Sequence, residues 1–209
     1  MRLIQIALPA LLLTGAAGML IAQAPSAPPG KADASLVTAG TYTLDPDHTL
    51  VEWTVDHLGF SPYFGLFGKI TGTLELDPAN PAAAKVDVTI PVSKVLTANP
   101  ALTGHLLKPA AEGGKADFFG ANPDDSHFVS TGVVANVETA TITGNLTLNG
   151  VTKPVTLEAT FYGAGAARNK ENLGFTATGT IKRSEFGIGF GIPMVSDAVQ
   201  LRIAAAFQK

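Results

Sequence analysis

The stretch TITGNLTLNGVTKPVTLEATFYG, residues 141–163, alternates apolar and polar residues on both sides of Asn149-Gly150. Alternation with a period of two is typical of a β-strand with one apolar face, because successive side chains point to opposite sides of the sheet. Asn149-Gly150 suits a type I′ turn, since both central residues of that turn need a positive φ. The stretch therefore predicts a β-hairpin that buries one of its faces.

The same alternation recurs along most of the chain beyond residue 40, and the helical period is almost absent. We expect about eight strands, mainly antiparallel to their neighbours and joined by turns rich in Gly, Pro and Asn. They cover residues 49–57, 69–77, 86–90, 127–138, 141–148, 155–161, 173–181 and 199–207. Residues 57–70 are expected to be a Gly-rich connection crowded with aromatic residues. Residues 100–119 lose the alternation and predict a short helix over 101–107, followed by a Gly-rich loop.

Residues 1–24 are predicted to be a secretory signal peptide. They combine Arg2, a long apolar stretch and the small-residue triplet Ala22-Gln23-Ala24. An uncleaved membrane anchor is the alternative, because the apolar stretch also has about the length of a bilayer span. A Pro- and Ala-rich tether is expected over residues 25–39 and a single domain over residues 40–209. Export would place this domain in the periplasm.

The composition excludes two classes of protein. The chain has 209 residues, a formal net charge of −3 and no cysteine. A nucleic-acid partner is not expected, because proteins that bind nucleic acids normally present a basic patch. A disulfide scaffold is excluded as well, so the stability of the domain must come from its hydrophobic core.

Strands with one apolar face must bury it, either between two packed sheets or inside a closed barrel. An eight-stranded barrel can be filled by its own side chains or can hold one small ligand. Small residues at inward positions leave room for an apolar ligand, or they only accommodate bends in the strands, and both interpretations are open. These residues are Gly72, Gly144, Ala159, Ala177, Gly179 and Ala205. If they line a hollow, Gly144→Leu or Ala177→Phe should fill it and spare the fold.

Several segments, taken together and in order, resemble the YceI-like family of secreted, lipocalin-like proteins that bind polyisoprenoid or related lipids. The segments are YTLDPDHTLVEWTVDHLGF (42–60), GLFGKITGTLELDP (65–78), HLL (105–107) with DFF (117–119), FVST (128–131), ITGNLTLNGVTKPVTLEATFYG (142–163) and IKRSEFGIG (181–189). The resemblance implies an eight-stranded antiparallel lipocalin-like barrel with a short helical insertion. It also implies an elongated apolar pocket that takes a long-chain lipid.

The resemblance places His48, His57, His105 and Arg183 on motif residues of the family. Residues 108–116, KPAAEGGKA, are inserted relative to the family and should lengthen a loop near the pocket entrance. For Arg183 we expect an ion pair with Glu185 at the protein surface. The alternative is that Arg183 binds the polar end of a lipid.

Catalytic chemistry has little support in the sequence. It contains no G-x-S-x-G elbow, no P-loop and no dinucleotide-binding fingerprint. Asp45, Asp47 and His48 bring candidate metal ligands together, but their spacing describes a turn at the start of a strand better than a metal site. No enzymatic activity, cofactor or metal is therefore expected. A lipid hydrolase or isomerase that uses His57 or His105 is kept as an alternative.

The predicted function is binding or carriage of a long-chain isoprenoid or quinone-like lipid inside the barrel. The inward residues expected to contact the lipid are Val51, Trp53, Val55, Phe60, Phe64, Leu74, Val88, Leu146, Leu157, Phe175, Ile181, Phe186 and Phe190. His57 is expected either to be a hydrogen-bonded core histidine or to contact a lipid head group at the mouth. The main alternative is an envelope interaction module with a filled barrel, and the formation of a homodimer is left open.

Overall fold

The computed structural model describes residues 27–209, so the signal peptide predicted over residues 1–24 lies outside the described residues. The strands are β1 (Gly40–Leu44), β2 (Leu50–His57), β3 (Ser61–Phe67), β4 (Thr71–Leu76), β5 (Lys85–Ile90), β6 (Ser126–Ala135), β7 (Thr139–Leu148), β8 (Val151–Ala167), β9 (Lys170–Lys182) and β10 (Ala198–Gln208). The helices are α1 (Pro100–Leu106) and four short 3-10 helices, η1 (Ala34–Leu36), η2 (Pro81–Ala83), η3 (Val92–Lys94) and η4 (Arg183–Phe186). Among these residues, no helix has the length and apolar character needed to cross a bilayer.

The hairpin predicted from residues 141–163 is present. β7 and β8 pair in antiparallel register around Asn149 and Gly150, whose φ angles are 53° and 73°. These positive values are those that a type I′ turn requires. β9 and β10 continue the sheet from β8, each antiparallel to the strand before it.

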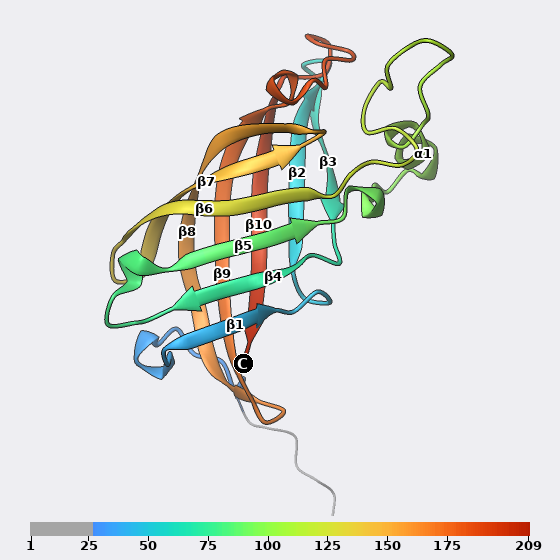
Figure 1. Ribbon diagram of the computed structural model, residues 1–209. Helices are drawn as coiled ribbons and strands as arrows, with labels where there is room; N and C mark the ends of the chain where they lie inside the picture. Colours follow the sequence, from blue (N-terminus) through green and yellow to red (C-terminus); the bar gives the residue numbers. More distant parts are fainter. Residues whose placement is uncertain (1–26) are drawn as a thin grey trace, which may run out of the picture.

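Eight of the ten strands close into an antiparallel barrel (Figure 1). They follow the order β1-β4-β5-β6-β7-β8-β9-β10, and β1 also pairs with β10 to complete the ring. The predicted fold class, an all-β eight-stranded antiparallel barrel with a short helical insertion, is confirmed. The helix begins at Pro100, one residue before the expected start.

β2 continues the path of β1 along β10 after a turn at residues 45–49. Leu44 pairs with Phe207, and Leu50 pairs with Ala204 further along β10. β2 then forms a hairpin with β3, where only a connection was expected. The strand was missed because Pro62 and Gly65 interrupt the pattern that is typical of strands. Apart from its pairing with β2, β3 makes one other β-bridge among the described residues, between Leu66 and Leu96. The β2–β3 hairpin therefore extends beyond the closed ring.

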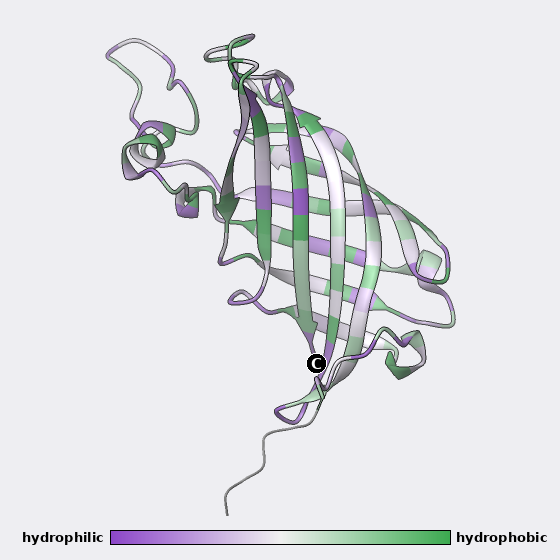
Figure 2. Ribbon diagram, turned by 180° about the vertical axis from the view of Figure 1, so that it is seen from behind, coloured by the Kyte–Doolittle hydropathy of each residue, from purple (hydrophilic) through white to green (hydrophobic). Residues whose placement is uncertain are grey.

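Two clusters of buried side chains fill the barrel from its lower end, where Figure 1 marks the C-terminus, to its middle. The lower cluster consists of Val37, Tyr42, Leu44, Ile70, Leu74, Ala164, Leu173 and Phe207. The middle cluster consists of Phe128, Leu146, Val155, Leu157 and Phe186. Figure 2 shows hydrophobic and hydrophilic residues alternating along the strands, as expected when one face of each strand points inward.

The small inward glycines do not leave a hollow, contrary to one of the two interpretations. A Cβ on Gly144 would lie 2.4 Å from the Phe128 ring, and a Cβ on Gly179 would lie 2.7 Å from Leu157. At Gly72 it would lie 2.2 Å from a backbone oxygen. Side chains or backbone of neighbouring strands occupy the space beside these glycines, so Gly144→Leu cannot fill a cavity and spare the fold.

Part of the segment expected to be a tether packs on the barrel. Lys31 and Ala164 exchange two backbone hydrogen bonds of 2.9 Å each, and Val37 is 9% exposed within the lower cluster. Thr38 donates hydrogen bonds from its backbone N–H (2.9 Å) and its hydroxyl (2.7 Å) to the carboxylate of Glu171 on β9. The chain is therefore fixed to the barrel before β1 begins.

Glu171 connects this segment, β1 and the end of the chain. Besides the hydrogen bonds from Thr38, its carboxylate accepts one from the Tyr42 hydroxyl and lies 3.3 Å from Lys209 Nζ. Partial burial disfavours the charged carboxylate, but the hydrogen bonds from Tyr42, Thr38 and Lys209 outweigh it and lower the pKa of Glu171 to about 2. The ionised form of Glu171 thus stabilises the lower end of the barrel.

Glu171→Gln should destabilise the protein in a pH-dependent manner. Since the folded-state pKa is depressed, the stabilisation by Glu171 is present above the ordinary pKa of 4.5 and is lost as the pH falls from there through about 2. We expect the free energy of unfolding to fall by about 1–3 kcal/mol at neutral pH, with little difference left at about pH 2. Urea unfolding across this pH range measures the effect. Glu112→Gln, in an exposed loop, is the control, and a difference that persists in strong acid would contradict the assignment.

Gly144→Ala should lower the free energy of unfolding by about 1–3 kcal/mol, because the added methyl group would force the Phe128 ring out of place. Gly189→Ala is the matched control, since nothing lies within 4 Å of a Cβ at Gly189. Denaturant unfolding of the two variants at neutral pH provides the comparison. Equal stability of both variants would show that the Phe128 ring adapts without cost.

Candidate ligand-binding cavity

A cavity of about 510 Å³ lies at the upper end of the barrel, beside the β2–β3 hairpin. Its apolar lining residues are Trp53, Val55, Tyr63, Phe67, Leu102, Leu106, Phe118, Phe119, Leu148, Ile181, Ile188, Phe190, Val195, Val199 and Leu201, and its polar ones are His57, Asn99, His105 and Arg183. A second hollow of about 170 Å³, near Asn122 and Asn149, is smaller and more polar. The larger cavity is therefore the candidate site for an apolar ligand.

The barrel side of the cavity is made by the inward faces of β2, β9 and β10. On β2, Trp53, Val55 and His57 follow one another at a spacing of two and share a face. Leu201 on β10 lies directly opposite Trp53, and Val199 lies opposite Ile181 on β9. The alternation read from the sequence thus produces one continuous apolar wall across three strands.

Trp53 is the only tryptophan of the chain and lies against Gly65 on β3. A Cβ on Gly65 would be 2.3 Å from the indole ring, so this position needs glycine. The indole Nε1 is buried and has no hydrogen-bond partner among residues 27–209. A buried N–H without an acceptor is unfavourable, and an oxygen atom on a bound molecule could satisfy it.

Helix α1 forms the opposite side of the cavity. Asn99 caps its first turn, because the side-chain oxygen accepts hydrogen bonds from the backbone N–H groups of Ala101 (3.0 Å) and Leu102 (3.4 Å). Leu102, His105 and Leu106 follow at helical spacing and all line the cavity. The helical insertion is therefore part of the candidate site.

An aromatic cluster connects α1 to the loop before β10. The rings of His105, Phe118 and Phe190 lie 5.4–5.5 Å apart in edge-to-face arrangements. His105 Nε2 also lies 2.9 Å from the carboxylate of Asp117. These contacts hold the inserted segment against the cavity mouth, where Phe190 is 48% exposed.

Arg183 fixes the loop that borders the cavity. Arg183 is 5% exposed. Its guanidinium group donates hydrogen bonds to the backbone oxygens of Ser196 (2.9 Å), Ile188 (3.2 Å), Phe190 (2.8 Å) and Val195 (2.8 Å). Burial lowers the pKa of Arg183, and the nearby Asp197 carboxylate acts in the opposite direction. The expected surface ion pair with Glu185 is wrong, because Arg183 is buried and bound to the loop backbone.

Five of the residues expected to contact a lipid line the cavity: Trp53, Val55, His57, Ile181 and Phe190. Their contact with a ligand stays a prediction. The others that point inward pack in the two side-chain clusters below the cavity. Val51, Leu74, Val88 and Phe175 lie in or against the lower cluster, and Leu146, Leu157 and Phe186 lie in the middle cluster.

The inward orientation expected for Phe60 and Phe64 is wrong. Phe60 is 89% exposed and Phe64 is 60% exposed. Phe64 lies opposite Thr54, on the outer face of the β2–β3 hairpin, because its neighbours Tyr63 and Gly65 face the inner residues Val55 and Trp53. Phe60 lies in the turn between the two strands, so its ring does not pack against either face of the sheet.

Sequence reasoning missed the contributions of α1 and of residues 118–119. The spacing of Leu102, His105 and Leu106 is the signal that could have identified the lining face of the helix. Nothing in the sequence indicated that Phe118 and Phe119 would lie beside this helix. Their position follows from contacts distant along the chain, such as the edge-to-face packing of Phe119 against Phe67.

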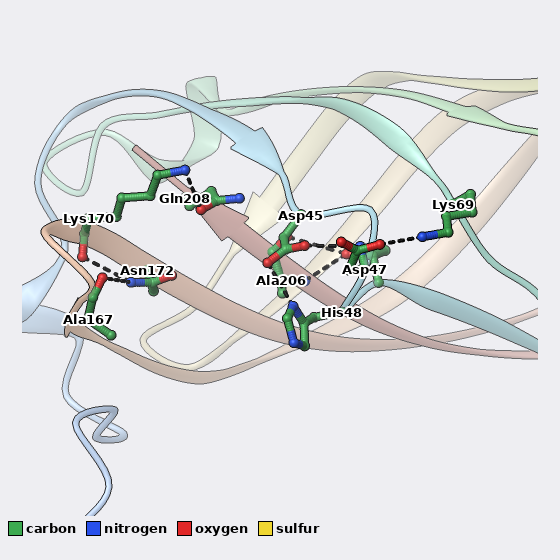
Figure 3. Close-up of polar contacts among 10 residues, drawn as sticks. Asp45, Asp47, His48, Lys69, Ala167, Lys170, Asn172, Ala206 and Gln208 are labelled. Carbon is green, nitrogen blue, oxygen red and sulfur yellow. Dashed lines mark hydrogen bonds and ion pairs between the residues drawn. The ribbon is translucent and has the colours of Figure 1, made fainter. Parts of the chain in front are cut away.

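Asp45, Asp47 and His48 form the expected turn, at the lower end of the barrel and away from the cavity (Figure 3). The Asp45 carboxylate accepts a hydrogen bond from the Asp47 N–H (3.0 Å) and lies 2.8 Å from His48 Nδ1, and Asp47 pairs with Lys69. The same end carries the polar contacts of Lys170 with Gln208 and of Asn172 with the β8–β9 turn. This end of the barrel is polar and charged.

A closed antiparallel barrel with an apolar cavity at one end defines a lipocalin-like binding barrel. Residues 42–207 match the family model described as the YceI-like domain, and the chain belongs to the YceI-like family. Protein YceI of Escherichia coli O157:H7 is 38% identical over 175 residues, which cover 82% of this chain and 88% of that protein.

Two solved structures have a similar fold. The crystal structure of BcnA from Burkholderia cenocepacia has a TM-score of 0.66 and 26% identity, covering 78% of this chain and 98% of that one. A polyisoprenoid binding domain from Saccharophagus degradans has a TM-score of 0.53 and 12% identity, covering 79% and 97%. At that identity, the second likeness concerns the fold alone.

Arg183→Lys should loosen the loop at residues 187–197. A lysine ammonium group cannot reproduce the planar fork that serves four carbonyl oxygens, so we expect a loss of about 2–4 kcal/mol in the free energy of unfolding. Amide hydrogen exchange should become faster in this loop and stay slow in the lower cluster. The control is Arg202→Lys at an exposed position on β10. Unchanged exchange in the loop would contradict the role of Arg183.

Proposed function

We propose that the protein binds a long-chain isoprenoid or quinone-like lipid in the cavity at the upper end of the barrel. The apolar lining of this cavity is the observation that carries the proposal. Its volume of about 510 Å³ lies within the range of about 300–1,000 Å³ that is typical of small-molecule sites. The name of the Saccharophagus degradans domain, a polyisoprenoid binding domain of the same fold, supports this class of ligand.

The affinity would come mainly from removing the lipid tail from water. Burial contributes about 25 cal/mol per Å² of apolar surface, partly offset by the ordering of a flexible chain. Charged side chains would contribute little, since Arg183 already donates to the loop backbone. The hydrophobic effect thus favours a long apolar chain over a compact polar molecule.

The polar end of the lipid would be recognised by few groups. Trp53 Nε1 has no acceptor among the described residues, and a hydroxyl or carbonyl oxygen on the ligand would supply one. His57 lines the cavity and is exposed, so it lies where the cavity meets solvent. We place the protein in the periplasm on the basis of the predicted signal peptide, as part of the same proposal.

The ligand can be identified by native mass spectrometry of the protein purified from its own cells, followed by organic extraction. We expect one long-chain lipid per protein molecule. Repeated recovery of empty protein that also refuses added polyprenols and quinones would overturn the proposal and favour a protein-binding role.

Val55→Phe should lower the affinity for added polyprenol or quinone about tenfold or more, because the larger side chain occupies the cavity. The fluorescence of Trp53, the only tryptophan, reports binding at the site itself. Thr54→Phe is the matched control, since Thr54 lies on the outer face of the same strand opposite Phe64. Equal affinities of the two folded variants would place the ligand elsewhere.

A further inference from the structure

Two loops at the upper end of the barrel form one connected unit. They are residues 57–61, which comprise the end of β2, the turn and the start of β3, and residues 187–195, which follow η4. We call them the tip loops (Figure 1). His57 and Val195 form a β-bridge, and the Leu58 N–H donates to the Met194 oxygen at 2.7 Å. Arg183 holds the second loop from below. The exposed residues of both loops are therefore kept together.

Large apolar side chains are exposed on the tip loops. Their exposed fractions are 89% for Phe60, 58% for Met194, 48% for Phe190, 41% for Leu58 and 36% for Ile192. Single exposed apolar residues are ordinary on soluble proteins, but five on two connected loops make a patch that is typical of an interaction site.

The tip loops also lack charge. Residues 57–68 and 186–196 contain no Asp, Glu, Lys or Arg. The opposite end of the barrel carries the charged and polar contacts of Figure 3, including Asp45, Asp47, Lys69 and Lys170. The tip loops are thus uncharged, with Asp56 at the edge of the first one, whereas the opposite end of the barrel carries several charged groups.

The cavity is continuous with this apolar end. His57, Phe190 and Val195 belong to the tip loops and line the cavity. A lipid that enters or leaves the cavity on this side passes the tip loops, and its apolar tail would contact water there unless another apolar phase covered them.

We propose that the tip loops insert into the interface of a lipid bilayer, so that the cavity mouth opens toward the acyl chains. This inference rests on the proposed lipid-binding function and adds the surface from which the lipid is taken up. A bilayer fits better than a protein partner, because stable protein interfaces use about 20–30 residues a side with a polar rim, whereas this patch has five apolar residues and no charge. The attachment is expected to depend on apolar burial, as in other interfacial membrane proteins.

The test uses the absence of cysteine in the chain. Ser61→Cys, beside Phe60, and Val137→Cys, at an exposed site between β6 and β7, each carry one environment-sensitive fluorophore. The full-length proteins are titrated with phosphatidylcholine vesicles, with and without phosphatidylglycerol, at low and high salt. The fluorophore reports its own surroundings, so attachment through another part of the chain gives no signal at Ser61.

We expect a blue shift at Ser61 on both vesicle types and at both salt concentrations, and none at Val137. Adding Phe60→Ser and Met194→Ser should weaken vesicle binding about tenfold or more. Adding Val134→Ser and Tyr162→Ser, at exposed sites outside the tip loops, should leave it unchanged. No shift at Ser61, equal shifts at both sites, or a shift only with anionic lipid at low salt would overturn the inference. So would a dimer that the tip substitutions dissociate.

The two proposals fail in different ways. Phe60 and Met194 do not line the cavity, so Phe60→Ser with Met194→Ser should keep the Trp53 response to added lipid in solution and lose vesicle docking. Val55→Phe should lose the Trp53 response to added lipid and keep vesicle docking. A Trp53 response to lipid without docking overturns only the docking inference, whereas docking without any bound lipid overturns only the proposed function.

Discussion

One edge of β10 pairs with β9 along its whole length, whereas the other edge pairs with β1 and then with β2. The cavity depends on this change from β1 to β2. Near the C-terminus, Phe207 and Gln208 pair with β1, which is also bonded to β4, so the ring closes there. From Ala204 to Gln200, β10 pairs instead with β2, whose other neighbour is β3. Since β3 does not continue into β4 through a ladder in the described residues, the upper end of the ring stays open between strands. The segment that carries α1 covers this opening and supplies the opposite side of the cavity.

The turn at residues 45–49 makes this change possible. It takes the chain out of the sheet after Leu44 and returns it at Leu50, and the Asp45 N–H and Thr49 hydroxyl both bond the Ala206 oxygen while it does so. The Asp45 carboxylate bonds His48 and the Asp47 N–H, and the Asp47 carboxylate pairs with Lys69, so each of these side chains has a partner within the protein. The candidate metal ligands of the sequence thus form the turn between β1 and β2, at the end of the barrel opposite the cavity.

Much of the fold could be predicted because strand alternation, the Asn149-Gly150 turn and the loss of alternation after Pro100 are all local signals. The position of the cavity could not, because it depends on which inward residues meet across the barrel. The sequence suggested empty space in the barrel beside Gly144 and Gly179. In the structure, Phe128 and Leu157 from neighbouring strands occupy that space. Phe60 and Phe64 were misplaced for a related reason: the pairing of β2 with β3 decides which face of the hairpin is inner, and β3 was not predicted.

The filled lower barrel also sets a limit on the cavity. Leu148 and Ile181 line the cavity and at the same time pack against the middle cluster, so that cluster forms the floor. Phe186, 1% exposed, lies within it and directly precedes the loop that Arg183 fixes. Floor, cavity wall and tip loops are therefore joined through one short stretch of chain, residues 181–195. Because the floor consists of close-packed side chains, which resist displacement, a ligand in the cavity could not extend downward through the barrel.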